Sequence, residues 1–324
     1  MHEKEEEKRT ETIEIDKVNI DDYEVKIEGL KDNVKKLKKL KKREKEIAEL
    51  EKEKNNILKE INRKHKKRWY KVAEAINSLL EYLEENNITI SDFSKNKKLK
   101  KLKYINDEDV KNQLSIVNEF HKCVSVYRCA SSHMLPMQTG KLVEEYKKRK
   151  KYFKKYIELL KSKKDLNNFE KVIFEYSDEY LNRSEKVLKV ISNSRYISII
   201  KRSMDKYEIC LGNTNFSNLR KRKNLEIASL QDCSFCNVEM DAIYLLSKLK
   251  RKNVKLDLNN LIDFYIKAEK LDDNSKKFIL AMLSFPSGLI NLVLDYKKGK
   301  KNFSSEENLL KLKNEIIKDN YSLI

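Results

Sequence analysis

Two cysteines with the spacing of a metal-binding pair, Cys233 and Cys236, are the first residues that could do chemistry. A structural zinc site needs four ligands, usually two such pairs or a cysteine pair with a histidine pair. The sequence offers no second pair at that spacing, and Cys210 alone does not complete a site. Redox activity would require a thioredoxin-like βαβ context, which is also missing. We interpret these residues as buried or incidental thiols, with oxidative cross-linking left open as an alternative.

Other familiar catalytic patterns are also missing from the sequence. The first 139 residues contain one glycine, Gly29, which excludes a Walker loop and a kinase-type glycine-rich loop there. His133 and the nearby serines at 131–132 form no arrangement with an aspartate that indicates a hydrolase. His121 lies on an apolar helix face, a pattern that favours a hydrogen-bonded histidine of the core.

The stretch from Ile209 to Asn218 has the spacing of a phosphotransferase catalytic loop. In kinase-like phosphotransferases of the aminoglycoside and choline type, this loop follows a short strand and reads His-Gly-Asp, four residues, then Asn. The corresponding residues here are Leu211 for the His, Gly212 for the Gly, Asn213 for the Asp, and Asn218 for the Asn. The sequence therefore resembles this superfamily at its most informative motif.

Within that superfamily, the sequence is similar to the spore coat proteins of the CotS type from endospore-forming bacteria. The similar stretches occur in family order with family spacing, and the resemblance extends over about residues 109–324. They are Val117 to Lys122, the Lys- and Glu-rich segment 141–162, Phe169 to Val190, Asp241 to Lys252, Met282 to Pro286, and Asp295 to Lys297.

The resemblance assigns roles to three positions and predicts that the motif is degenerate. A kinase aspartate orients the attacking hydroxyl, but Asn213 at that vestigial base position has no carboxylate and cannot act as a base near neutral pH. The metal position falls to Asn218 and, at the family spacing, to Gln231, which is a poor Mg²⁺ ligand. The neighbouring Asp232 would serve if the hairpin were one residue longer. We therefore expect no catalytic residue and no cofactor, with Mg-ATP only if the vestigial site at Asn218 and Asp232 still binds.

The elements that must position this motif are predicted to be mainly α-helical. Gly (5) and Pro (2) are scarce, and long stretches have helical periodicity. A charged helix should cover about 31–85, with a loose heptad seam typical of a weak coiled coil, and should end at Asn86-Asn87. A strand-like run at 207–211 and a hairpin at 219–231 should frame the loop. Further helices are expected at 109–127, 141–162, 167–191, 195–205, 239–252, 257–270, 274–298 and 305–320.

The resemblance implies a protein-kinase-like carboxyl lobe at 105–324 with a small β hairpin. The amino lobe is expected to be missing or replaced by charged helices, so residues 1–104 are predicted to form a charged, mostly helical extension. Residues 1–30 lack clear helical periodicity. Their alternating patches at 13–15 and 25–27 could be strands or part of a disordered segment.

The net charge of +19 has two interpretations. One is a polyanion partner, with Lys-rich stretches at 35–45 and 95–103 as the contact. The other is a genome rich in A and T, since 59 of the 71 basic residues are Lys and both Asn and Ile are plentiful. Nucleic-acid sites usually rely on Arg for bidentate contacts, so the second interpretation is favoured and sequence-specific nucleic-acid binding is not expected.

The resemblance to CotS-type proteins implies a non-catalytic, pseudokinase-like spore coat protein that acts in coat structure or assembly. The alternatives are a small-molecule or sugar phosphotransferase with altered catalytic residues, and non-specific polyanion binding. The expected partners are other coat proteins, with self-association through the helix at 31–85. No segment has the roughly 18 apolar residues of a membrane span, and the charged residues after Met1 do not form a secretory signal. We expect synthesis in the mother-cell cytoplasm followed by deposition on the spore coat.

Overall fold

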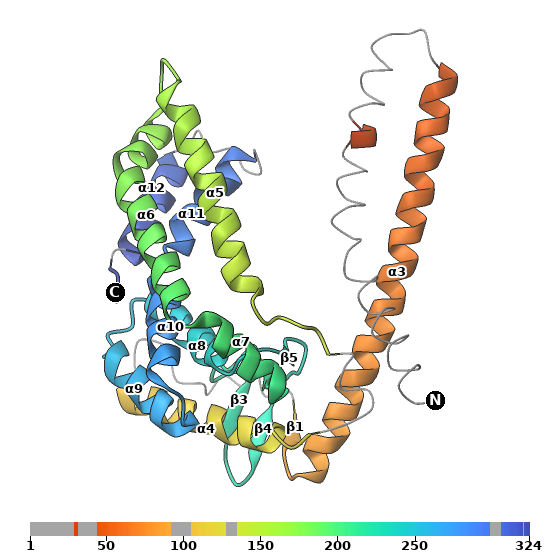
Figure 1. Cartoon of the computed structure of the whole chain (residues 1–324), viewed down its shortest axis with the longest axis vertical. Coiled ribbons are helices and arrows are strands. Elements are labelled where there is room, and N and C mark those ends of the chain that lie inside the picture. The colour runs from red at the N-terminus through yellow and green to blue at the C-terminus, as the bar shows by residue number, and fades with distance from the viewer. Residues whose placement is uncertain (1–28, 32–43, 92–104, 128–134, 299–305, 320) are drawn as a thin grey trace. The chain divides into compact units, whose positions relative to one another are not determined.

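The computed structural model describes residues 29–31, 44–91, 105–127, 135–298, 306–319 and 321–324, with all their side chains except those of 44–50, 61–62 and 64–69. By contacts between residues, the chain divides into two compact units, Met1–Glu74 and Ala75–Ile324. The division falls inside the long helix α3 (Glu44–Glu85), which is drawn in orange in Figure 1. The last turns of α3 therefore belong to the second unit.

In the part of α3 that belongs to the first unit, the side chains of residues 51–60 are exposed or half-buried. Ile57 is half-buried and Leu58 is 38% exposed. The other residues of the predicted heptad seam, Leu40, Ile47, Leu50 and Ile61, fall outside the described side chains. The coiled coil therefore stays a prediction, as do the strands at 13–15 and 25–27, which also lie outside the described residues.

The second unit begins with the apolar end of α3. Ala75, Leu79 and Leu83 recur at helical spacing and are fully buried. The helix ends at Glu85, as predicted, because Asn87 adopts a left-handed conformation with φ of 61°. A short strand, β1 (Thr89–Ile90), follows directly.

Helices make up most of the second unit, which confirms the mainly α-helical prediction. They are α4 (Asp107–Val124), α5 (Lys141–Lys161), α6 (Asn168–Asn193), α7 (Tyr196–Asp205), α8 (Glu239–Arg251), α9 (Leu258–Glu269), α10 (Asp273–Ser284), α11 (Ser287–Lys297) and α12 (Glu306–Lys318). One predicted helix was wrong, because residues 274–298 form two helices. Phe285 is extended, as the residue before a proline tends to be, and Pro286 has no N–H to continue the ladder.

Polar residues start several of these helices where the sequence changes from loop to periodic pattern. Asn106 and Asp109 form a reciprocal capping box at the start of α4, and Asn167 and Glu170 form another at α6. Asp272 accepts a hydrogen bond from the backbone of Ser275 and so caps α10. These local contacts explain why the observed boundaries lie close to the predicted ones.

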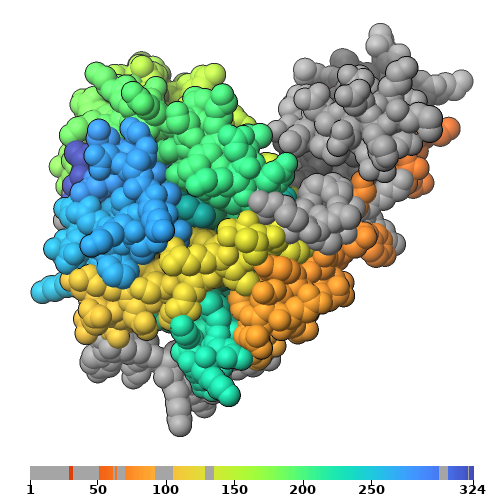
Figure 2. All heavy atoms as spheres, turned by 60° about the horizontal axis from the view of Figure 1, so that its bottom comes forward, coloured from red at the N-terminus to blue at the C-terminus, as the bar shows by residue number. Residues whose placement is uncertain are grey.

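Two small sheets lie between the helices. The hairpin of β3 (Leu219–Lys221) and β4 (Leu225–Ile227) is extended by β1, which pairs in parallel with β4. In Figure 2 the hairpin projects beside α4 at the edge of the unit. The second sheet pairs β2 (Ile209–Cys210) with β5 (Ser234–Phe235) in antiparallel fashion. The backbone at 136–138 adds hydrogen bonds to the free edge of Phe235.

Helix α6, drawn in green in Figure 1, packs against α5, α7, α10 and α12. Its buried Ile173, Tyr180 and Val187 face a continuous apolar core that includes most of α10 and α11. Among the described residues no single helix is long and apolar enough to cross a membrane, whereas α10 and α11 together, bent by 44°, meet those limits.

Candidate functional site

The loop between β2 and β3, residues 211–218, begins with a glycine that no other residue could replace without strain. Gly212 has φ of +75°, in the left-handed region that side chains disfavour. A Cβ atom built there would lie 2.4 Å from the carbonyl oxygen of Asp232. The loop is thus pressed against the backbone that follows β4, and this close approach brings Asp232 beside the start of the loop.

Asp241, in the first turn of α8, holds the backbone of the same loop. Its carboxylate is fully buried and accepts hydrogen bonds from the backbone N–H groups of Leu211 and Gly212, both at 2.8 Å. The Thr214 hydroxyl donates to the Asp241 carbonyl at 3.0 Å. The N-terminal turn of a helix favours a negative charge, so α8 also stabilises this carboxylate.

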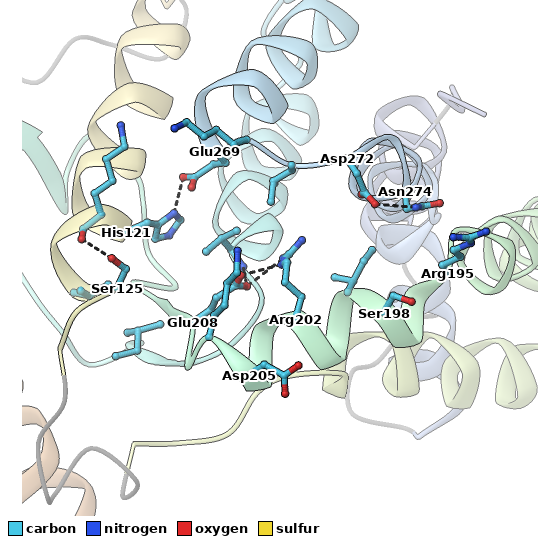
Figure 3. A pocket seen from close by; sticks show the side chains of 18 residues that line it. His121, Ser125, Arg195, Ser198, Arg202, Asp205, Glu208, Glu269, Asp272 and Asn274 are labelled. Carbon is cyan, nitrogen blue, oxygen red and sulfur yellow. Dashed lines mark hydrogen bonds and ion pairs between the residues drawn. The ribbon is translucent and has the colours of Figure 1, made fainter.

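His121 supports Asp241 from behind. Its Nε2 lies 2.9 Å from the Asp241 carboxylate and its Nδ1 lies 2.7 Å from that of Glu269, a contact drawn in Figure 3. Burial alone would lower the pKa of His121, but the two carboxylates outweigh burial and raise this pKa to about 10. Burial would likewise raise the pKa of Glu269, yet the charge of His121 lowers it. The three groups form an acid–imidazolium–acid set in which both ring nitrogens donate.

Asn213 and Asn218, the predicted base and metal positions, are bonded to each other within the loop. The Asn218 amide nitrogen donates to the Asn213 carbonyl at 2.7 Å and to the Ser229 carbonyl at 3.1 Å. The side-chain oxygen of Asn213 accepts a short hydrogen bond from the amide of Asn215. Because both amide protons of Asn218 point at carbonyls, its side-chain oxygen faces the other way and is the atom left for a ligand.

The hairpin brings the second predicted metal position to the same loop. Asp232 is exposed and lies against Gly212, whereas Gln231 is exposed and donates its backbone N–H to Ser229. Asp232 therefore lies beside the start of the loop that carries Asn213 and Asn218, and its carboxylate and the Asn218 side-chain oxygen are the two candidate ligands for a cation. Mg²⁺ prefers carboxylate oxygens, so this is a poorer donor set than a pair of acids.

Sequence reasoning missed three residues that fix the loop: Gln113, Asp241 as its anchor, and Glu269. The Gln113 amide, buried on α4, donates to the Thr214 and Leu219 carbonyls, both at 2.9 Å. A polar residue at a position of the apolar face of α4 was the available signal. It indicates a buried hydrogen bond but does not name its partner.

Cys210, Cys233 and Cys236 are buried and pack around β2 and β5. The Cys210 thiol donates to the carbonyls of Cys236 and Asn237, and burial raises the pKa of Cys210 and of Cys233. The possible ligand atoms of His121, Cys210 and Asp241 lie within 4.8 Å of one another. The histidine and the aspartate are already bonded to each other, and the thiol is neutral, so this cluster is satisfied without a metal.

The structure is similar to the crystal structure of an aminoglycoside phosphotransferase from Alicyclobacillus acidocaldarius subsp. acidocaldarius DSM 446, with a TM-score of 0.53 and 11% sequence identity. The similarity covers 69% of this chain and 66% of that chain, which is slightly less than two thirds of the neighbour. No protein-family model and no curated protein matches the chain.

At this identity the similarity shows the fold alone. The chain therefore has a mainly helical fold similar to that of this aminoglycoside phosphotransferase, which confirms the coarse part of the prediction. The finer parts, a CotS-type coat protein and a missing or replaced amino lobe, remain predictions.

Proposed function

We propose that the chain is a non-catalytic, pseudokinase-like protein of the spore coat that acts in coat structure or assembly. The observation that carries the proposal is the state of the loop at 211–218. The base position is an amide, Asn213, whose oxygen already accepts a hydrogen bond from Asn215. An amide has no proton-accepting capacity near neutral pH, so the loop lacks the group that orients an attacking hydroxyl.

The loop keeps its architecture although its acid is replaced. Asp241 and Gln113 bind the loop backbone, and the Thr214 hydroxyl of the loop donates to the Asp241 carbonyl; none of these groups would transfer a phosphoryl group. Such a framework supports a role in which the fold is reused as a rigid module. The sequence resemblance to CotS-type proteins is what suggests the coat, with assembly in the mother-cell cytoplasm and deposition on the spore.

Other coat proteins are the partners we propose, with α3 as the contact. Most of the charged side chains described in the part of α3 that belongs to the first unit are exposed, and the division of the chain indicates where a deletion should stop. Removing residues 1–74 spares Ala75, Leu79 and Leu83, which are buried in the second unit. The truncated protein, checked for folding by its melting curve, should fail to enter the coat of sporulating cells. Normal incorporation would count against this role of α3.

The alternative is a small-molecule or sugar phosphotransferase, favoured by one specific observation. The Asn218 oxygen faces away from its two carbonyl partners, and the exposed Asp232 lies beside the loop. These two groups would hold Mg²⁺, which would neutralise charge on the phosphates of a bound nucleotide.

Thermal melting with and without millimolar ATP and Mg²⁺ distinguishes the two functions. A ligand present at about 100 times its dissociation constant stabilises a protein by roughly 2.7 kcal/mol. The non-catalytic proposal expects no Mg²⁺-dependent shift. A shift that depends on Mg²⁺ and is removed by Asn218→Ala, together with phosphate transfer, would favour the phosphotransferase.

A further inference from the structure

A pocket of about 630 Å³ opens on the side of β2 away from the loop at 211–218. It lies where the carboxyl end of α4, helix α7 and the α9–α10 connection come together (Figures 2 and 3). Glu208 and Ile209, at the start of β2, line its inner wall, whereas the loop follows the end of that strand. Its volume is within the range of small-molecule sites, about 300–1,000 Å³.

The acidic groups of the pocket are mostly engaged. Glu208 binds Arg202 at 2.9 Å, as Figure 3 shows, and Glu269 binds His121. The Asp272 carboxylate accepts from the Ser275 backbone and from the Asn274 amide, which leaves Asp205 as the acid without such a partner among the described residues. These carboxylates are therefore not available as a set for a cationic ligand.

Helices α4, α7 and α9 all end at this pocket, but carbonyls at their ends already accept backbone hydrogen bonds. The His121 carbonyl accepts from the Ser125 N–H, the Arg202 carbonyl from the Lys206 N–H, and the Ile266 carbonyl from the Leu271 N–H. Carbonyls at helix ends attract cations chiefly when they lack such partners. The backbone thus adds little to a cation site.

The basic side chains at the rim of the pocket differ from these acids and carbonyls. Lys122, Arg195, Lys206 and Lys270 line the pocket from three different helices or their ends. Within the part of the chain that the structure describes, none of the four forms an ion pair or a side-chain hydrogen bond. Between them lies an apolar floor made of Val124, Ile199, Val238 and Leu271. The groups left for a ligand are four cations, one hydroxyl at Ser198, one acid and an apolar surface.

We propose that this pocket binds a small organic anion, with its apolar body on the floor and its carboxylate, sulfonate or phosphate group among the rim cations. The site is separate from the loop that bears Asn213, and it would exist whether or not that loop is catalytic. Selective binding of such an anion needs both the rim cations and the apolar floor, because lysines alone on a surface attract any anion weakly.

The probe is 8-anilinonaphthalene-1-sulfonate, an aromatic anion whose fluorescence rises in an apolar site, titrated into the full-length protein at 150 mM NaCl. N-phenyl-1-naphthylamine is its uncharged counterpart. We expect one saturable site for the sulfonate and at least tenfold weaker binding of the neutral compound. Equal affinity for both compounds, or no saturable sulfonate binding, would overturn the proposal.

Two variants locate the site. Lys206→Gln with Lys270→Gln removes two rim charges, and Ser198→Trp fills the pocket without changing charge; each should weaken sulfonate binding at least tenfold. The matched control is Lys148→Gln with Lys151→Gln on the exposed face of α5, which makes the same change in net charge and should leave affinity within twofold. Melting curves confirm that each variant folds, and the lysine pair decides alone if Ser198→Trp does not. An equal loss in the control, or unchanged binding in the pocket variants, would show that the protein's general charge binds the probe.

Discussion

Two buried cations of the second unit lie in different surroundings. His121, behind the loop at 211–218, lies between the carboxylates of Asp241 and Glu269. Lys250, on α8, donates instead to two backbone carbonyls, Leu283 at 2.8 Å and Tyr321 at 2.9 Å. The first cation is matched by two carboxylates, and the second by backbone dipoles and by the ring of Tyr321, whose centre lies 4.4 Å from Nζ.

Their pKa values move in opposite directions for that reason. Burial lowers the pKa of Lys250 to about 8; the nearby Arg183 contributes to this shift, and Asp319 opposes it. The pKa of His121 rises to about 10 although burial acts in the same sense on both groups. Burial alone therefore does not decide what a charged side chain contributes to stability. Around the loop at 211–218, the two carboxylates compensate the charge of His121 and the site is preorganised. The region around Lys250 and Tyr321 instead carries a buried charge that is unfavourable at neutral pH.

The largest effect should come from removing the compensated cation. His121→Gln leaves Asp241 and Glu269 buried without their counter-charge, so unfolding free energy at pH 6 should fall by about 3–5 kcal/mol. The native pKa of His121 lies above its unfolded value, so its contribution is complete below pH 6.5 and is lost as the pH rises through 10. Urea unfolding between pH 6 and 10 should show the variant and the parent protein converging.

The control for this variant is an ion pair that is exposed on the surface. Lys147 pairs with Glu144 on the exposed face of α5, and Lys147→Gln should cost about 0–1 kcal/mol at any of these pH values. A similar cost in the two variants would mean that the buried set is no stronger than a surface pair. The comparison between the two buried cations would then lose its basis.

The loop itself should be the next most sensitive point. Gly212→Ala combines a left-handed φ with a contact of 2.4 Å to the Asp232 carbonyl, and we expect a loss of about 3 kcal/mol. Gly140 also has a positive φ, of 82°, but a Cβ there would meet nothing closer than 3.5 Å. Gly140→Ala should therefore cost about 1 kcal/mol, from the backbone conformation alone. Equal losses in urea unfolding would show that the close approach is not a constraint.

Lys250, the cation without a carboxylate partner, should have a smaller effect on stability. The sign of its pH dependence is opposite to that of His121. The native pKa of Lys250 lies below the unfolded value of 10.5, so the native state binds fewer protons and gains stability as the pH rises from about 8 to 10.5. Lys250→Met removes this gain. The stability difference between parent and variant should change by up to about 3 kcal/mol across that window. Lys148→Met, on the exposed face of α5, should give a difference that does not vary with pH.

Much of the helical fold followed from the sequence because its signals are local. Asn106 and Asn167 begin their helices through contacts three residues away, and Asn87 ends α3 by its own conformation. The prediction of a single helix at 274–298 is wrong at Pro286. The apolar pattern of the sequence continues across this proline, but the helix does not. Apolar periodicity identifies helices reliably only when breakers inside the pattern are respected.

The site was predictable only in part because its contacts are long-range. The spacing of Asn213 and Asn218 placed them in one loop, which a strand and a hairpin indeed frame. The anchors of that loop come from far along the chain: Gln113 lies 101 residues from Thr214, and His121 lies 120 residues from Asp241. No periodicity in a single sequence pairs such residues. The pocket was missed for the same reason, since its rim draws cations from separate helices.

The smallest expected effect is the one that separates the two proposed functions. Asn213→Asp restores a carboxylate at the base position without altering the shape of the side chain, and Asp241 and Gln113 should keep the loop in place. If the protein is non-catalytic, neither parent nor variant should transfer phosphate from Mg-ATP to a panel of sugars and amino alcohols. A phosphotransferase that lacks only its base would instead gain about 10²–10⁴ in rate. Asn213→Ser, which adds no carboxylate, is the matched control, and a gain confined to the aspartate would replace the structural role with an enzymatic one.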